Sequence, residues 1–203
     1  MRNKIEELKN MKRLLVVVDM VKGFKEKGNM AITDASHIDQ EVVRLVKDFL
    51  KNGDDVISVQ EGHTKDSQEF HDFLEHCLLG TEEAELIECL KPFEKKMKVI
   101  RKNSTCGYVT KEFRQYLENE RNFLKEVVVV GVCLDICVVN LAIPVKMDLN
   151  EHNIDSLVVV PMNAVETFDS PMHKREEYKI LAKKMLNLNG IKTPSNYYKE
   201  ERC

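Results

Sequence analysis

The chain has 203 residues, of which 43% are hydrophobic and 32% are charged, and its formal net charge is −3 at pH 7. This length suits one domain with a sizeable core, and the composition excludes an intrinsically disordered chain. The slightly negative net charge gives no reason to expect a basic surface that binds nucleic acid. No apolar run reaches the roughly 20 residues of a membrane span. We therefore expect one domain, residues 1–203 with a core over about 12–193, that binds neither nucleic acid nor membrane.

The N-terminus and the cysteines together predict a cytoplasmic location. Residues 1–10 (MRNKIEELKN) are a polar lead-in, long enough for a short helix, without the apolar region of a signal peptide. The six cysteines show no metal-finger spacing, and Cys133 and Cys137 are separated by three residues rather than the two of a redox pair. We expect all six to be reduced thiols in the cytoplasm.

Apolar runs that suit buried strands alternate along the chain with segments of helical periodicity. The first run, at 12–19 (KRLLVVVD), is followed by a helical segment with one apolar face that ends at Asn52-Gly53. The predicted strands cover 12–19, 56–60, 98–101, 127–130 and 157–161, with a candidate sixth at 191–193, and the predicted helices cover 34–51, 110–119, 135–150 and 170–188. This alternation predicts a doubly wound α/β fold, a mostly parallel sheet with helices on both faces.

The valine strand at 127–130 organises the predicted site. Four consecutive β-branched residues suit a strand buried on both faces, and this strand stops at Gly131. Asp135 is then predicted as the N-cap of the next helix, with Cys137 in its first turn. The helix dipole and the unpaired backbone N–H groups there would favour the thiolate. The alternative is that Cys137 is simply a small buried residue, as free cysteines often are.

Two further polar residues follow strand ends, Asp19 after the first strand and Lys102 after the third. Taken singly, each has an ordinary explanation, Asp19 as a cap and Lys102 as a solvated charge. A parallel sheet, however, brings the carboxyl ends of its strands to one edge, where ligands bind in open α/β sheets. With Cys137 the three would supply a nucleophilic thiol, a carboxylate that takes its proton and a cation that favours the charged pair.

Three motifs together resemble the cysteine hydrolases of the nicotinamidase and isochorismatase-like family: VVVDM at 16–20, IRKNSTCGY at 100–108 and GVCLDICVVNLA at 131–142. The resemblance covers about 12–191. It implies a six-stranded parallel sheet, a catalytic triad of Asp19, Lys102 and Cys137, and a non-proline cis peptide just before Cys133. It also implies an oxyanion hole formed by the N–H groups of Cys133 and Cys137. Leu134 departs from the family pattern, since many relatives have threonine there.

The connection at 61–81 resembles the metal-binding loop of nicotinamidases. The resemblance implies one divalent ion, with Zn²⁺ favoured over Mn²⁺ or Fe²⁺, and no organic cofactor. The implied ligands are Glu61, His63, Glu69 (directly or through water) and His76 ahead of Gly80-Thr81. Glu61 departs from the usual aspartate and Gly62 from the usual aromatic residue, and the alternative is a solvated loop with incidental histidines. His71 lies outside the pattern, and His173 matches a histidine of some relatives without an assigned role.

The resemblance therefore implies a cysteine-dependent amidohydrolase that cleaves a small amide through a thioester on Cys137, with nicotinamide as the favoured substrate. It also implies a homo-oligomer. The first alternative is a metal-free isochorismatase-like hydrolase of another small amide or of an enol ether. The second is a non-catalytic scaffold with the same fold, against which the intact triad argues.

Overall fold

The computed structural model describes residues 11–198, so the polar lead-in at 1–10 lies outside the described residues. The strands are β1 Lys12–Val18, β2 Asp55–Glu61, β3 Lys98–Lys102, β4 Leu124–Val132, β5 Leu157–Val159 and β6 Val165–Glu166. The α-helices are α2 Lys22–Lys25, α3 Asp39–Lys51, α4 Lys111–Glu120, α5 Val139–Glu151 and α6 Arg175–Leu188. None of these helices is both long and apolar enough to cross a membrane.

The strands form one parallel sheet in the order β3-β2-β1-β4-β5, and β6 also pairs with β4. This confirms the predicted doubly wound six-stranded sheet. The position predicted for the sixth strand, 191–193, is wrong, because only an isolated bridge joins Val159 to Lys192 there. The sixth strand is instead β6, which lies beyond β5 along the same edge of β4.

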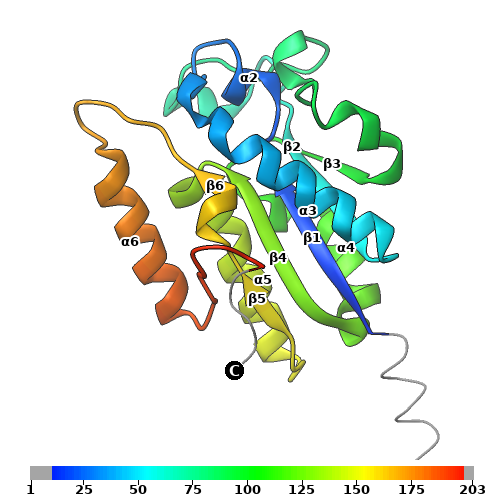
Figure 1. Ribbon diagram of the computed structural model, residues 1–203. Coiled ribbons are helices and arrows are strands. Elements are labelled where there is room, and N and C mark those ends of the chain that lie inside the picture. Colours follow the sequence, from blue (N-terminus) through cyan, green and yellow to red (C-terminus); the bar gives the residue numbers. More distant parts are fainter. Residues whose placement is uncertain (1–10, 199–203) are drawn as a thin grey trace, which may run out of the picture.

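The two central strands are apolar on both faces because both faces of the sheet are covered by helices. Every residue of Leu14–Val18 in β1 and of Val127–Val130 in β4 is fully buried. One face packs against α3 and the segments around it, and the other packs against α4, α5 and α6 (Figure 1). The predicted strand at 127–130 therefore lies in the middle of the sheet, where both of its faces are buried.

The chain changes direction across the sheet between β1 and β4, which lie side by side although two strands separate them in sequence. At such a switch point the carboxyl ends of the strands border a crevice. Gly131 lets β4 approach β1 there: its φ is +114°, and a Cβ at this position would lie 2.0 Å from the carbonyl oxygen of Val18. The close approach brings Asp19 next to the turn that follows β4.

In three of the predicted helices the regular α-helix begins later than expected. The segment predicted as helix from 34 begins with a 3₁₀ turn, Thr33–Ile38, before α3, and the one predicted from 170 becomes α6 only at Arg175. The helix predicted from 135 begins with a π turn, Leu134–Val138, and continues as α5. Pro144 lies inside α5, and the carbonyl of Asn140, which proline leaves without an N–H partner, accepts the Cys106 thiol at 3.0 Å.

Candidate active site

Lys102 is the centre of a buried polar cluster at the carboxyl edge of the sheet. It is the last residue of β3 rather than the residue after it, and its side chain is inaccessible to solvent. Its Nζ lies 2.9 Å from Asp19 Oδ2 and 2.5 Å from Glu61 Oε1. The same nitrogen lies 3.7 Å from Cys137 Sγ. The structure thus brings together the three residues predicted as a triad, and it adds Glu61 to them.

Asp19 is held at the end of β1 by the strand beside it. Its N–H donates to the carbonyl of Val59 at 2.8 Å, and its Oδ1 accepts the N–H of Glu61 at 2.8 Å. The residue is fully buried, and its φ is +51°. Burial raises the pKa of Asp19 to about 6, with the Glu61 charge acting in the same direction and the Lys102 charge opposing it. The raised pKa makes this carboxylate a better proton acceptor than an ordinary aspartate.

Cys137 lies in the π turn with only 4% of its surface exposed. Burial raises the pKa of its thiol well above the ordinary value, against the attraction of Lys102. The expectation that a helix start would favour the thiolate is therefore wrong for the resting site, because loss of hydration outweighs the nearby positive charge. A protonated thiol needs a base to become a nucleophile. The Cys137 sulfur and one carboxylate oxygen from each of Asp19 and Glu61 lie within 4.8 Å of one another, so Asp19 is close enough to serve.

The turn between β4 and α5 has an unusual backbone. The peptide bond between Val132 and Cys133 is cis, as the family resemblance implied. Asp135 is not an N-cap, which corrects that prediction: Cys133 occupies the cap position, without a side-chain cap bond, and the Asp135 carboxylate accepts bonds from outside the turn. Leu134 is fully buried in the core on the α5 side of the sheet, so the core accommodates this departure from the family pattern.

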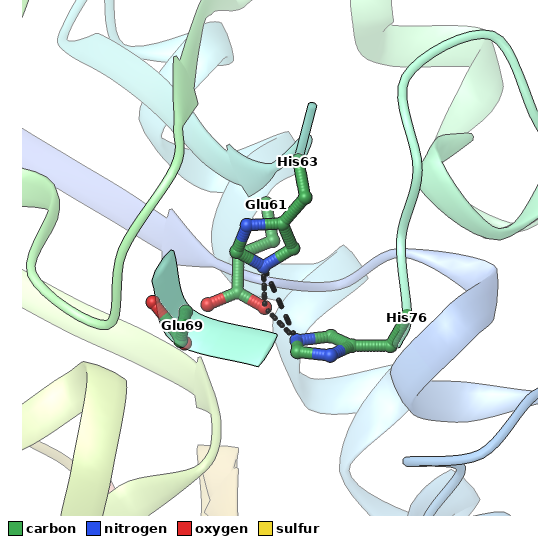
Figure 2. A group of neighbouring side chains, drawn as sticks. All are labelled: Glu61, His63, Glu69 and His76. Carbon is green, nitrogen blue, oxygen red and sulfur yellow. Dashed lines mark hydrogen bonds and ion pairs between the residues drawn. The ribbon is translucent and has the colours of Figure 1, made fainter. Parts of the chain in front are cut away.

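The four residues predicted as metal ligands also converge. One ligand atom from each of Glu61, His63, Glu69 and His76 lies within 4.8 Å of the others. His76 Nε2 lies 2.9 Å from Glu61 Oε2, and His63 Nε2 lies 3.5 Å from the same oxygen. Figure 2 shows both imidazoles directed at the Glu61 carboxylate, with Glu69 on the other side of it. Across the described residues His71 is exposed and outside this group.

The hydrogen bonds around the two imidazoles explain why a cation suits this group. His63 Nδ1 lies 3.0 Å from Asn103 Oδ1, and His76 Nδ1 lies 2.7 Å from the carbonyl oxygen of Leu74. When the proton of each neutral imidazole is on Nδ1, bonded to these acceptors, the Nε2 lone pairs face the carboxylate. The two Nε2 atoms are only 3.3 Å apart. Electron pairs that converge in this way require a metal ion or a proton between them.

Glu61 joins the two groups, which sequence reasoning did not foresee. One carboxylate oxygen pairs with Lys102 and the other faces His76. Burial would raise the pKa of Glu61, but the charge of Lys102, together with His63 and His76 beside the carboxylate, holds it well below its ordinary value. Asn103 was also missed, and its place directly after Lys102 was the available signal. The result is one continuous site in which a carboxylate links the thiol–lysine cluster to the two imidazoles.

Comparisons with known proteins agree with this geometry. A family model of the isochorismatase domain matches residues 13–186. Nicotinamidase 1 of Arabidopsis thaliana is 31% identical over 183 residues, which covers 81% of this chain and 73% of that protein. The crystal structure of a nicotinamidase from Bacillus subtilis superposes with a TM-score of 0.74 at 25% identity, covering 91% of this chain and 100% of that one. A pyrazinamidase of Pyrococcus horikoshii in complex with zinc shares the fold, with a TM-score of 0.70 at 22% identity and coverage of 90% and 98%.

Proposed function

The chain belongs to the isochorismatase family, as a nicotinamidase-like hydrolase that acts on a C–N amide bond, and we propose that it cleaves nicotinamide to nicotinate and ammonia through a thioester on Cys137. The observation that carries this proposal is the position of Lys102 Nζ, 2.9 Å from Asp19 Oδ2 and 3.7 Å from Cys137 Sγ. A thiol and a carboxylate on either side of one cation, within 4.8 Å of each other, are the groups that nucleophilic catalysis by cysteine requires. Homo-oligomeric assembly, a cytoplasmic location and a single domain over 1–203 stay predictions.

In the proposed mechanism, Asp19 takes the proton of the Cys137 thiol while Lys102 stabilises the resulting thiolate. The thiolate attacks the amide carbon, and the backbone N–H groups of Cys133 and Cys137 hold the developing oxyanion. The loss of one such donor typically costs about 10²–10³ in rate. Asp19 then protonates the amide nitrogen as the C–N bond breaks, so that ammonia leaves. The same carboxylate activates the water that hydrolyses the thioester.

Glu61, His63, Glu69 and His76 would hold one divalent ion, with zinc as the favoured metal, since imidazole and carboxylate donors suit it. An ion bound there would anchor the substrate by its pyridine nitrogen. The chemistry of the donor set supports this assignment, because two imidazole Nε2 atoms and a carboxylate oxygen face one another at 2.9–3.5 Å. The zinc complex of the Pyrococcus horikoshii pyrazinamidase, a relative in fold, agrees with it.

The substrate and the metal can be tested together by elemental analysis of purified protein and an ammonia-release screen over small amides. We expect one equivalent of a divalent metal per chain and the highest kcat/KM with nicotinamide. If another amide is strongly preferred, the substrate assignment is wrong while the amidohydrolase assignment stands.

Asp19→Asn tests the role of the carboxylate as proton acceptor. Asparagine conserves the shape of the side chain and tolerates the φ of +51° better than most residues, so the fold should survive. We expect kcat to fall by at least about 10²-fold, the lower range for a positioned acid–base group. Steady-state kinetics and thermal unfolding measured on the same sample separate the two roles. A variant with a lowered melting temperature and an unchanged kcat would mean that Asp19 is only structural.

His63→Ala tests the metal site. The imidazole would be lost from the donor set, so we expect weaker metal binding, and KM should rise more than kcat falls if the ion mainly anchors the substrate. Elemental analysis after dialysis measures the first effect and steady-state kinetics the second. His71→Ala is the matched control, since His71 is exposed and outside the group. If neither chelators nor the loss of His63 changes the activity, the enzyme belongs among metal-free amidohydrolases.

A further inference from the structure

A second polar cluster lies against the π turn, on the side of the β6–α6 connection. His173 Nε2 lies 2.6 Å from Asp135 Oδ2, and the Thr167 hydroxyl donates to Asp135 Oδ1. Thr167 follows β6, and His173 lies two residues before α6 begins. Both oxygens of the Asp135 carboxylate are therefore bound by a segment more than 30 residues farther along the chain.

The His173 ring is fixed in its orientation from all sides. It stacks between Phe168, with ring centroids 3.8 Å apart, and Tyr178, with centroids 3.7 Å apart. Its Nδ1 lies 3.1 Å from the carbonyl oxygen of Phe168, so each ring nitrogen faces an acceptor. The residue is only 9% exposed. A ring held this tightly presents its Nε2–H to Asp135 in a single direction.

Asp135 lies between the two residues on which the proposed chemistry depends. It stands two residues after Cys133 and two before Cys137, the residues whose N–H groups form the proposed oxyanion hole. Inside the turn, the N–H groups of Ile136 and Val138 share one acceptor, the carbonyl oxygen of Cys133. Among residues 11–198, no side chain caps the turn at its first position. A carboxylate anchored at both oxygens therefore supplies support that the turn's own hydrogen bonds lack.

We propose that His173 and Thr167 are positioning residues that act through Asp135 to hold Cys137 and the two N–H groups in their reactive arrangement. This inference rests on the proposed function, since it concerns the same nucleophile. Both side chains bind the Asp135 carboxylate, so the proposed effect on the reacting atoms is indirect. Because a displacement of about 1 Å can cost a catalytic site about 10²-fold in rate, a loosened turn should lower kcat more than it changes KM.

Two substitutions separate the hydrogen bond from the packing. His173→Phe keeps a flat ring between Phe168 and Tyr178 but donates no hydrogen bond, and we expect kcat to fall about 10- to 100-fold with little change in KM. His173→Gln keeps an N–H donor without the aromatic ring and should recover part of that loss. Thr167→Val removes the other donor and should lower kcat in the same direction. Hydrogen exchange of the peptide that contains 133–138 should be faster in each variant, without a matching increase in the strands of the sheet.

The matched control is His152→Gln, because His152 also faces an aspartate, at 3.5 Å from Asp148 Oδ1, but on an exposed helix end. It should leave kcat, KM and the exchange of 133–138 unchanged. A folded His173→Phe variant with the kcat and local exchange of the unmodified enzyme overturns the proposal, as does a loss of melting temperature alone. If that variant does not fold, unchanged kcat and exchange in Thr167→Val and His173→Gln overturn it equally. An unmodified protein that hydrolyses no amide contradicts the proposed function instead, and local exchange then still decides the positioning role.

Discussion

Cys137→Ala is expected to abolish amide hydrolysis, with kcat lowered by about 10⁴-fold or more, as for other enzymes that lose a catalytic nucleophile. Its Sγ is the atom that lies 3.7 Å from Lys102 Nζ, at the end of the buried cluster. Without it, no thioester forms, and the carboxylate and the lysine have no thiol to activate. The smaller side chain keeps the apolar surroundings of the turn, so the melting temperature should stay close to that of the unmodified enzyme. Ammonia release under saturating amide measures the effect.

Cys89→Ala is the control for this change, since it removes an exposed thiol. It should leave turnover unaltered. Amidase activity that persists in the Cys137 variant would end the proposal of cysteine catalysis and direct attention to the metal group as the source of the nucleophile.

The meeting of Asp19 and Cys137 could be predicted from the sequence for a topological reason. Both follow long valine-rich runs, and such runs occupy the middle of a parallel sheet because both of their faces are buried. Neighbouring central strands put their carboxyl ends side by side, so the residues just beyond them must meet. The outcome depends only on burial and on strand direction, and both leave a pattern in the sequence.

The contact between Glu61 and Lys102 could not be predicted in the same way. It depends on β2 and β3 being neighbours and on the register that places Glu61 opposite Lys102. Neither strand order nor register can be read from composition or periodicity, so Glu61 was assigned to the metal group alone. The raised pKa of Cys137 was missed for a related reason: the sequence places a lysine and a helix start nearby, but it does not say how completely water is excluded.

The sixth strand was misplaced because it is too short to leave a pattern. β6 has two residues, and one of them, Glu166, is a buried carboxylate that pairs with Lys179 at 3.0 Å. Periodicity needs at least four residues to distinguish a strand. The segment at 191–193 has the apolar residue that a strand needs, yet it pairs with the sheet edge through an isolated bridge at Lys192.

Lys102→Met is expected to be the most destabilising single change in the site and to remove activity as well. The cation is fully buried between two carboxylates that are themselves buried, 2.9 Å from Asp19 and 2.5 Å from Glu61. Burial would lower the pKa of Lys102, but the charges of Asp19 and Glu61 help raise it well above the ordinary value, so the lysine is charged in the folded protein. Methionine fills a similar volume without the charge. Breaking a buried ion pair on one side typically costs about 3–5 kcal/mol, because the remaining charge is left without a partner.

Denaturant unfolding of metal-free protein measures this cost without a contribution from metal binding. Lys98→Met, an exposed position on the same strand, should change the free energy of unfolding by no more than about 0.5 kcal/mol. The double variant Lys102→Met/Asp19→Asn should recover part of the stability, since one of the two unpaired carboxylates becomes a neutral amide, but none of the activity. Residues in direct contact normally couple by about 0.5–3 kcal/mol. If the change in the free energy of unfolding of the double variant equals the sum of the changes in the two single variants, Asp19 and Lys102 do not interact in the folded protein. Activity retained in Lys102→Met would remove the lysine from the mechanism.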